Sequence, residues 1–212
     1  SSKNFPEKRA NATFFYFNGK HYLLGGGNRT KDLQDLWTLS LDNDKLEWNE
    51  IRSKDISPYT PRTGQAATLL GDKLYVFGGQ NFREGKMFDD ALCYDISLNQ
   101  WSILEVTKGP KPSARNSAIL EADPVKNRLY LYGGADLNGP LDDFYIYEIA
   151  KKEWFKIEFK EQKTPEPREM HTGFFYSGTL TVAPEVNAIS KKSEPKTIDL
   201  HFSNSLTDGT EE

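Results

Sequence analysis

The feature that most constrains this chain is an internal period of 53 residues. Three tryptophans recur at this interval, Trp48, Trp101 and Trp154, and so do four arginines, Arg9, Arg62, Arg115 and Arg168. A glycine pair falls in each of the first three intervals between arginines: Gly25-Gly26, Gly78-Gly79 and Gly133-Gly134. A period near 50 with a di-glycine after an apolar strand predicts repeated four-stranded units, as in a propeller. Functional residues are then expected on the loops, which differ between units.

Each repeat contains the same succession of short, mostly apolar strands. First strands are expected at 12–17, 66–70 and 172–176, and second strands at 22–26, 75–79 and 130–134, ending in the glycine pairs. Third strands are expected at 36–39, 92–96 and 144–147, directly or closely after Asp35, Asp90 and Asp143. The periodic tryptophan is expected to open the fourth strand, and a proline-bearing loop then leads to the next arginine.

This order of strands, glycine pair and tryptophan resembles the kelch repeat. The arginine after a proline-rich loop is most similar to kelch repeats of the host-cell-factor and Rab9-effector type. The resemblance covers residues 9 to about 166 in three copies. It implies an all-β, kelch-type β-propeller or partial propeller, with four-stranded blades and the first strand innermost. One domain over 1–212 would hold blades at about 9–61, 62–114 and 115–167, a degenerate blade at 168–207 and a tail at 203–212.

The fourth unit departs from the pattern. Pro184-Glu185 stands where the glycine pair belongs, and no tryptophan follows the expected third strand at 197–202. Kelch propellers usually have six blades, so three expectations stay open. The chain is part of a longer protein, or four units close alone, or two chains complete a ring. An open array would expose apolar sheet faces and favour self-association.

The periodic arginines are the first candidates for partner binding. In some kelch proteins, residues at this position bind acidic peptide segments, and guanidinium groups suit carboxylates. Arg62, Arg115 and Arg168 would then lie around the channel mouth. Alternatively, each arginine bonds loop carbonyls or a carboxylate in the next blade. Recurrence in every unit favours this structural role.

The loops after the glycine pairs are better candidates because they differ between repeats. Phe82 beside Arg83 has the composition of an interface anchor. Alternatively, Phe82 only covers the edge of its blade. The expected partner contacts on these loops are Arg29, Lys31, Asn81, Phe82, Arg83, Lys86, Asp136 and Asn138.

Composition argues against several other classes of function. The net charge of −4 provides no basic field for nucleic acid, and no apolar run approaches the length of a membrane helix. A single cysteine, Cys93, favours a reducing compartment, hence the cytoplasm or nucleus. His21, His171 and His201 lack ligand spacing, so no metal or cofactor is expected. No catalytic residue is expected either.

The resemblance therefore implies a non-catalytic scaffold for protein–protein interaction. Its partner would be a protein or peptide, with an acidic segment as one option, bound on the loop face. Two alternatives stay open. One is a kelch-fold, metal-dependent enzyme acting on a small molecule. The other is an accessory domain of a larger phosphatase or ubiquitin-ligase adaptor polypeptide.

Overall fold

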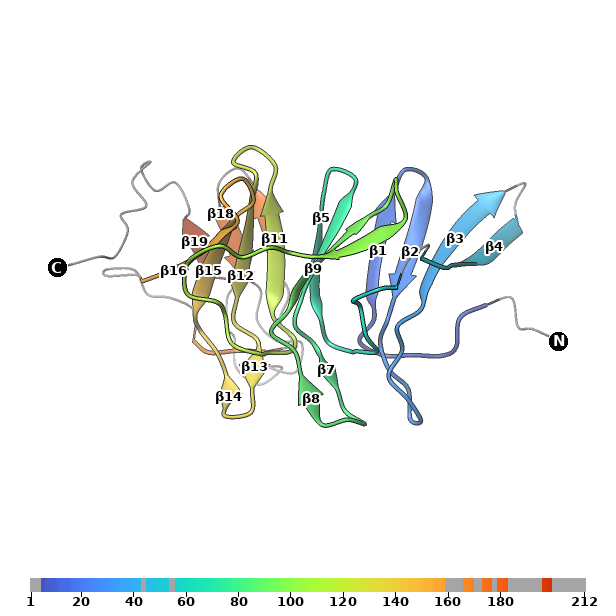
Figure 1. Ribbon diagram of the computed structural model, residues 1–212, viewed down its shortest axis with the longest axis horizontal. Helices are drawn as coiled ribbons and strands as arrows, with labels where there is room; N and C mark the ends of the chain where they lie inside the picture. Colours follow the sequence, from blue (N-terminus) through green and yellow to red (C-terminus); the bar gives the residue numbers. More distant parts are fainter. Residues whose placement is uncertain are drawn as a thin grey trace.

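The computed structural model describes residues 5–42, 45–53, 56–158, 166–169, 173–176, 179–182 and 196–199. These residues form an all-β structure of successive antiparallel sheets, which follow one another along the long axis of the molecule (Figure 1). Each of the sheets with three or four strands is one sequence repeat and is called a blade below. The all-β, kelch-type prediction of a propeller or partial propeller is therefore confirmed.

Three blades have four strands each, in sequence order across the sheet. Blade 1 consists of β1 (Thr13–Phe17), β2 (Lys20–Leu24), β3 (Leu36–Asp42) and β4 (Lys45–Ile51). Blade 2 consists of β5 (Ala66–Leu70), β6 (Lys73–Phe77), β9 (Ala91–Asp95) and β10 (Gln100–Ile103). Blade 3 consists of β11 (Ile119–Asp123), β12 (Arg128–Tyr132), β15 (Phe144–Glu148) and β16 (Glu153–Ile157). Blade 4 has three described strands, β17 (Gly173–Tyr176), β18 (Thr179–Val182) and β19 (Lys196–Asp199).

The predicted strands match these bounds to within a few residues, with one correction. Trp48 does not open its strand, because β4 begins at Lys45, so the hairpin formed by β3 and β4 is longer than expected. Trp101 and Trp154 are each the second residue of their strands.

The first strands of neighbouring blades lie side by side: β11 contacts both β5 and β17, as expected for innermost strands. The blade boundaries stay a prediction, and the proposed tail at 203–212 lies outside the described residues.

The loops after the glycine pairs of blades 2 and 3 are short hairpins. They are formed by β7 (Gln80–Asn81) with β8 (Lys86–Met87), and by β13 (Ala135–Asp136) with β14 (Gly139–Pro140). Both hairpins project from the same end of the blades, at the bottom of Figure 1. We call this end the loop face. The turn between β11 and β12 lies at the opposite end.

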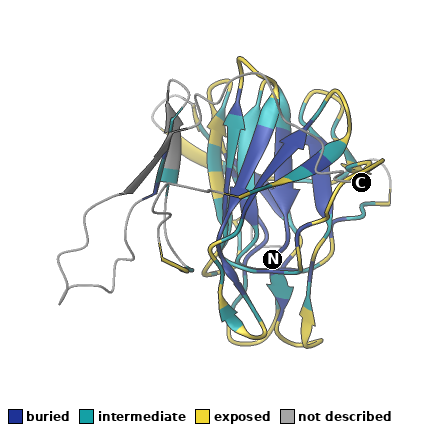
Figure 2. Ribbon diagram, turned by 90° about the vertical axis from the view of Figure 1, so that its left-hand side faces the viewer, coloured by how far each residue is buried: buried dark blue, intermediate teal, exposed yellow. Residues whose placement is uncertain are grey.

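The core lies between blades rather than within them. Successive residues of a strand point to opposite faces, so a middle strand contributes to two cores. In β6, Leu74 and Val76 pack against blade 1, whereas Tyr75 and Phe77 pack against blade 3. We call these the leading and trailing faces of a blade. Buried residues accordingly fill the stacked sheets, and exposed ones gather at their ends (Figure 2).

The periodic tryptophans lie on the leading faces. The Trp101 ring stacks on Tyr59, with 4.9 Å between ring centroids. Trp154 meets Phe77 of blade 2 edge-on at 5.7 Å and is almost fully buried. These contacts explain the recurrence of Trp101 and Trp154, because each of them fills the seam with the preceding blade.

Candidate functional site

The periodic arginines connect consecutive blades through their backbones. The N–H of Arg62 donates to the carbonyl of Leu33, and the carbonyl of Arg62 accepts from the N–H of Gly26, both in blade 1. Arg115 and Arg168 make the same two backbone bonds to the blades before them. Every seam between described blades is therefore closed by the same pair of hydrogen bonds.

The arginine side chains turn inward into their own blades. Arg62 donates to the carbonyl of Gly78 at 3.0 Å and to both carboxylate oxygens of Asp90, at 2.5 and 2.9 Å. Arg115 binds the carbonyl of Gly133 and both oxygens of Asp143 in the same way. A bidentate, charge-assisted pair of this kind fixes the guanidinium plane.

These pairs correct two expectations. The Arg62 and Arg115 side chains have no exposed surface, so they cannot contact a partner. Their carboxylate partners lie in the arginine's own blade rather than in the next one. The geometry thus favours the structural role for both residues. Arg168 is half-buried and donates to the carbonyl of Glu166; its part in partner binding stays a prediction.

The glycine pairs allow the seams to close. Gly134 has a positive φ of 90°, and its N–H donates to the carbonyl of Arg168. A Cβ at this position would lie 2.5 Å from the carbonyl oxygen of Asn116. Only glycine combines this backbone conformation with this close approach.

The loops that follow the glycine pairs are numbered by blade: loop one begins at Gly27, loop two at Gln80 and loop three at Ala135. They share one pattern of side-chain to backbone hydrogen bonds, called the scaffold below. In loop one, Oδ1 of Asn28 accepts from the N–H groups of Thr30 and Lys31 at 2.8 and 3.0 Å. In loop two, Oδ1 of Asn81 accepts from Arg83 and Glu84, both at 3.0 Å. Such bonds define an Asx turn, in which the side chain imitates a backbone turn.

Loop three repeats this turn, since Oδ1 of Asp136 accepts from the N–H of Asn138 at 2.7 Å. The residue after each turn-forming side chain therefore sits at an equivalent tip. These three residues, called the loop tips below, are Arg29, Phe82 and Leu137. All are exposed, Phe82 by 66% and Leu137 by 90%. The scaffold is constant and the tip side chain varies.

This scaffold corrects the expectation for Asn81. Its side chain is buried, and its Nδ2 donates to the carbonyl of Pro61 at 3.2 Å, so it braces the hairpin against the proline-bearing loop. Asp136 is half-buried and has the equivalent turn-forming role. Leu137 is not among the partner contacts expected from the sequence, yet it occupies an equivalent loop tip. The signal was available in the repeat register, because Leu137 follows Phe82 by the 55 residues that separate the two glycine pairs.

Loops one and two are in direct contact through hydrogen bonds. The guanidinium of Arg83 donates to the backbone carbonyl of Arg29, and the N–H of Arg83 lies 3.4 Å from a carboxylate oxygen of Asp32. Arg83 is exposed but engaged in this way, which holds the hairpin of blade 2 against the loop of blade 1. Lys31 is paired with Glu7 at 2.7 Å, and this contact lowers the pKa of Glu7. The Lys86 ammonium lies 4.9 Å from the centroid of the Phe88 ring.

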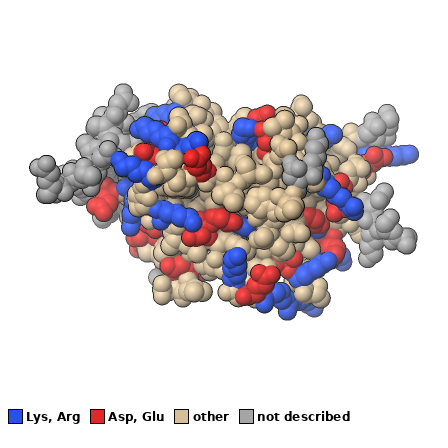
Figure 3. All heavy atoms as spheres, in the orientation of Figure 1, with Lys and Arg blue, Asp and Glu red and all other residues tan. Residues whose placement is uncertain are grey.

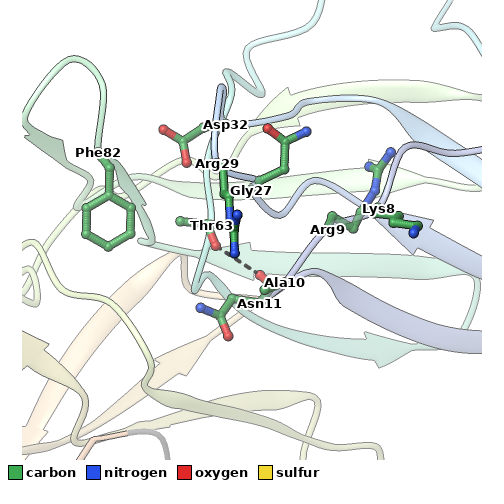
Figure 4. A pocket seen from close by; sticks show the side chains of 10 residues that line it. Lys8, Arg9, Ala10, Asn11, Gly27, Arg29, Asp32, Thr63 and Phe82 are labelled. Atoms are coloured by element: carbon green, nitrogen blue, oxygen red, sulfur yellow. Dashed lines mark hydrogen bonds between the residues drawn. The ribbon is translucent and has the colours of Figure 1, made fainter.

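An open cavity of about 480 Å³ lies between these loops and the segment that enters blade 1. In Figure 4, Phe82 stands on one side of it and Lys8 and Arg9 on the other. Arg9 is neutralised by Asp35, whereas Lys8 and Arg29 have no carboxylate partner among the described residues. Its lining residues are Lys8, Arg9, Ala10, Asn11, Gly27, Asn28, Arg29, Asp32, Thr63 and Phe82. The cavity thus combines an exposed aromatic ring with two unpaired cations.

The described part of the chain contains no group of three or more His, Cys, Asp or Glu side chains that could hold a metal ion. Burial in β9 raises the pKa of the Cys93 thiol, which disfavours the nucleophilic thiolate. On the face shown in Figure 3, basic and acidic side chains are interspersed rather than gathered in one basic patch. None of the described residues forms a helix that is long and apolar enough to cross a membrane.

Comparison with known proteins gives a consistent result. The model of the KLHDC2/KLHL20/DRC7 Kelch-repeats domain matches residues 64–183. The chain is 27% identical over 194 residues to Kelch repeat-containing protein 2 of Saccharomyces cerevisiae, covering 84% of this chain and 21% of that protein. It is 29% identical over 187 residues to an F-box/kelch-repeat protein of Arabidopsis thaliana, covering 81% and 37%.

One relative bears the name of an enzyme. N-(sulfonatooxy)prop-2-enimidothioate sulfolyase of Thlaspi arvense is 30% identical over 128 residues, covering 59% of this chain and 36% of the relative. The chain spans less than two fifths of the length of each of these three relatives. The host-cell-factor and Rab9-effector subtype stays a prediction.

Proposed function

This chain belongs to the kelch-repeat family, and on that premise we propose that it is a non-catalytic scaffold that binds a protein partner across its loop tips. One observation carries the proposal. Three loops keep the same Asx-turn scaffold and present three different exposed side chains on one face of the molecule. Constant framework with variable tips is the arrangement expected of a recognition surface.

The chemistry of the cavity suggests the kind of segment that would bind. Lys8 and Arg29 provide positive charge that no described carboxylate neutralises, and Phe82 provides an exposed ring within the same cavity. A partner segment with a carboxylate and a neighbouring apolar side chain would satisfy both. The carboxylate would pair with the cations, and the apolar group would cover Phe82.

The proposal is tested by photo-cross-linking from the loop face. Benzoylphenylalanine replaces Phe82, a conservative change at an exposed position, and the protein is irradiated in extracts of its native cells. The matched control carries the same residue at Val125, which is 90% exposed in the turn between β11 and β12 at the opposite end of the blades. The proposal predicts a discrete cross-linked protein from position 82 that is absent from position 125. Equal labelling from both positions, or none from position 82, would overturn it.

The similarity to a named sulfolyase favours one second candidate, a metal-dependent enzyme acting on a small molecule. Elemental analysis of the protein, purified without chelators, distinguishes the enzyme hypothesis from the scaffold hypothesis. Stoichiometric iron or copper would favour the enzyme. Metal far below one ion per chain would count against it.

A further inference from the structure

The three loop tips differ in chemistry along the row of blades. Arg29 of blade 1 is basic, Phe82 of blade 2 is aromatic and Leu137 of blade 3 is aliphatic. All three side chains are exposed on the loop face. Single exposed apolar residues are common on protein surfaces, but these two occupy equivalent positions of neighbouring blades, next to a basic tip. The row therefore offers one charged and two apolar contacts in a fixed order.

The packing of the blades sets the distance between neighbouring tips. Side chains of β2 and β6 share one core, and side chains of β6 and β12 share the next. Sheets that pack face to face in this way lie about 10 Å apart. A single side chain, that of Arg83 in loop two, spans the gap to the carbonyl of Arg29 in loop one, in agreement with this distance. Because the tips occupy equivalent positions, they are expected about 10 Å apart.

This spacing selects among the regular conformations of a bound segment. In polyproline II, every third side chain lies on the same side, and three residues advance about 9 Å. In a β-strand, the side chains of one face follow at about 7 and 14 Å, which misses the second tip. In an α-helix, seven residues or two turns advance about 10–11 Å. Polyproline II and the α-helix therefore match the tips, and the β-strand does not.

The cavity beside loop one separates the two remaining conformations. Arg29 and Phe82 both line it, so a segment that contacts both side chains has to enter it (Figure 4). The cavity measures about 480 Å³. Two turns of an α-helix, about 10–12 Å wide with their side chains, occupy about 1,000 Å³. An extended polyproline II segment is thinner, and exposed aromatic rings are its usual partners. The volume therefore favours polyproline II.

We propose that the loop tips bind a polyproline II segment with an acidic residue and, three and six places from it, two apolar residues, an inference that rests on the proposed function. The acidic side chain would lie at Lys8 and Arg29, which no described carboxylate neutralises. The first apolar side chain would cover Phe82, and the second would cover Leu137. Each blade would thus read one side chain in three.

The test is site-specific photo-cross-linking, with the labelled residues of the partner located by mass spectrometry. Benzoylphenylalanine replaces Phe82 in one variant and Leu137 in another. The control carries it at Val125, which is as exposed as Leu137, at 90%, but lies at the opposite end of the blades. The two loop-tip variants are expected to label one segment of one protein, at residues about three apart. An Asp or Glu is expected about three residues beyond the site labelled from position 82, on the side away from the other site.

Three results would overturn this inference and leave the proposed function intact. They are a partner labelled from position 82 but not from position 137, labelled residues about seven apart, as a helix would give, and labelled residues in distant segments. If position 82 labels no protein, the proposed function fails as well.

A second measurement decides the question if the cross-linking variant at position 137 fails to fold. Leu137→Ser is added to the protein that carries benzoylphenylalanine at position 82, and Val125→Ser is added as the matched control. Leu137→Ser is expected to lower the yield of the cross-linked product at least about fivefold, and the control is expected to leave it unchanged. An equal yield from both would overturn the inference. Circular dichroism checks the folding of each variant.

Discussion

Arg62 and Asp90 form a bidentate ion pair inside blade 2, and the backbone of the same arginine closes the seam with blade 1. One residue therefore fixes both the fold of its own blade and the position of the blade before it. The guanidinium also lies 3.9 Å from the centroid of the Phe88 ring, which completes its burial. This arrangement explains why the arginine recurs with the repeat.

Asp90→Asn is expected to destabilise the protein because it leaves the Arg62 charge buried without a carboxylate. Breaking a buried pair costs about 3–5 kcal/mol, and partial exposure of Asp90 reduces this to about 2–3 kcal/mol. The neighbouring Asp89 forms an exposed pair with Lys111, so Asp89→Asn is the matched control and should cost less than about 1 kcal/mol. Urea unfolding measures both. Equal losses for the two variants would contradict the bracing role of Arg62.

Gly134→Ala is expected to weaken the seam between blades 3 and 4. The added Cβ would lie 2.5 Å from the Asn116 carbonyl oxygen, in addition to the strain of a positive φ. Gly71→Ala isolates the strain alone, since Gly71 also has a positive φ but nothing within 4 Å of the added atom. That control should cost about 1–2 kcal/mol. Thermal unfolding should show a clearly larger loss for Gly134→Ala. If Gly134→Ala loses no more stability than Gly71→Ala, the close approach of the Asn116 carbonyl does not require glycine at position 134.

Stability is expected to depend on the ionisation of Glu121. Burial in β11 raises the pKa of its carboxyl group to about 7, from an ordinary value of 4.5. The folded state then binds the proton more tightly than the unfolded state. Stability is therefore greatest below pH 4.5 for this group and is lost as the pH rises through 7.

Glu121→Gln removes this ionisation while it keeps the shape of the side chain. Urea unfolding of both proteins between about pH 5 and pH 8 measures the effect. The wild type should lose stability relative to the variant as the pH rises. Parallel curves for the two proteins would show that Glu121 keeps an ordinary pKa.

Much of the framework could be predicted from the sequence. The period places each arginine, glycine pair and tryptophan, and the strands follow from apolar runs between turn residues. Structural roles for Tyr22 and Trp154 also follow, because each recurs at the same position in three successive units. The partner of each arginine could not be predicted, since Asp90 lies 28 residues from Arg62 and only the fold brings them together.

The candidate site was harder to predict from the sequence than the framework. The loop residues were recognised as variable, but Asn81 and Phe82 could not be separated into a buried brace and an exposed tip without coordinates. The cavity is lined by residues of two loops, which are joined by the hydrogen bond from Arg83 to the carbonyl of Arg29, 54 residues away in the chain. Contacts between loops of different blades leave no local pattern in the sequence.

The central claim is that the loop tips bind a partner and the framework does not. The most direct measurement is the affinity of the cross-linked partner for wild type and Phe82→Ala, by isothermal titration calorimetry, with melting temperatures measured in parallel. Leu98→Ala, an exposed leucine in the turn between β9 and β10, is the control. The account predicts at least about tenfold weaker binding for Phe82→Ala, or about 1.4 kcal/mol, with an unchanged melting temperature. Unchanged affinity would show that Phe82 does not bind the partner, and a large loss of stability would place Phe82 in the framework; either result would contradict the account.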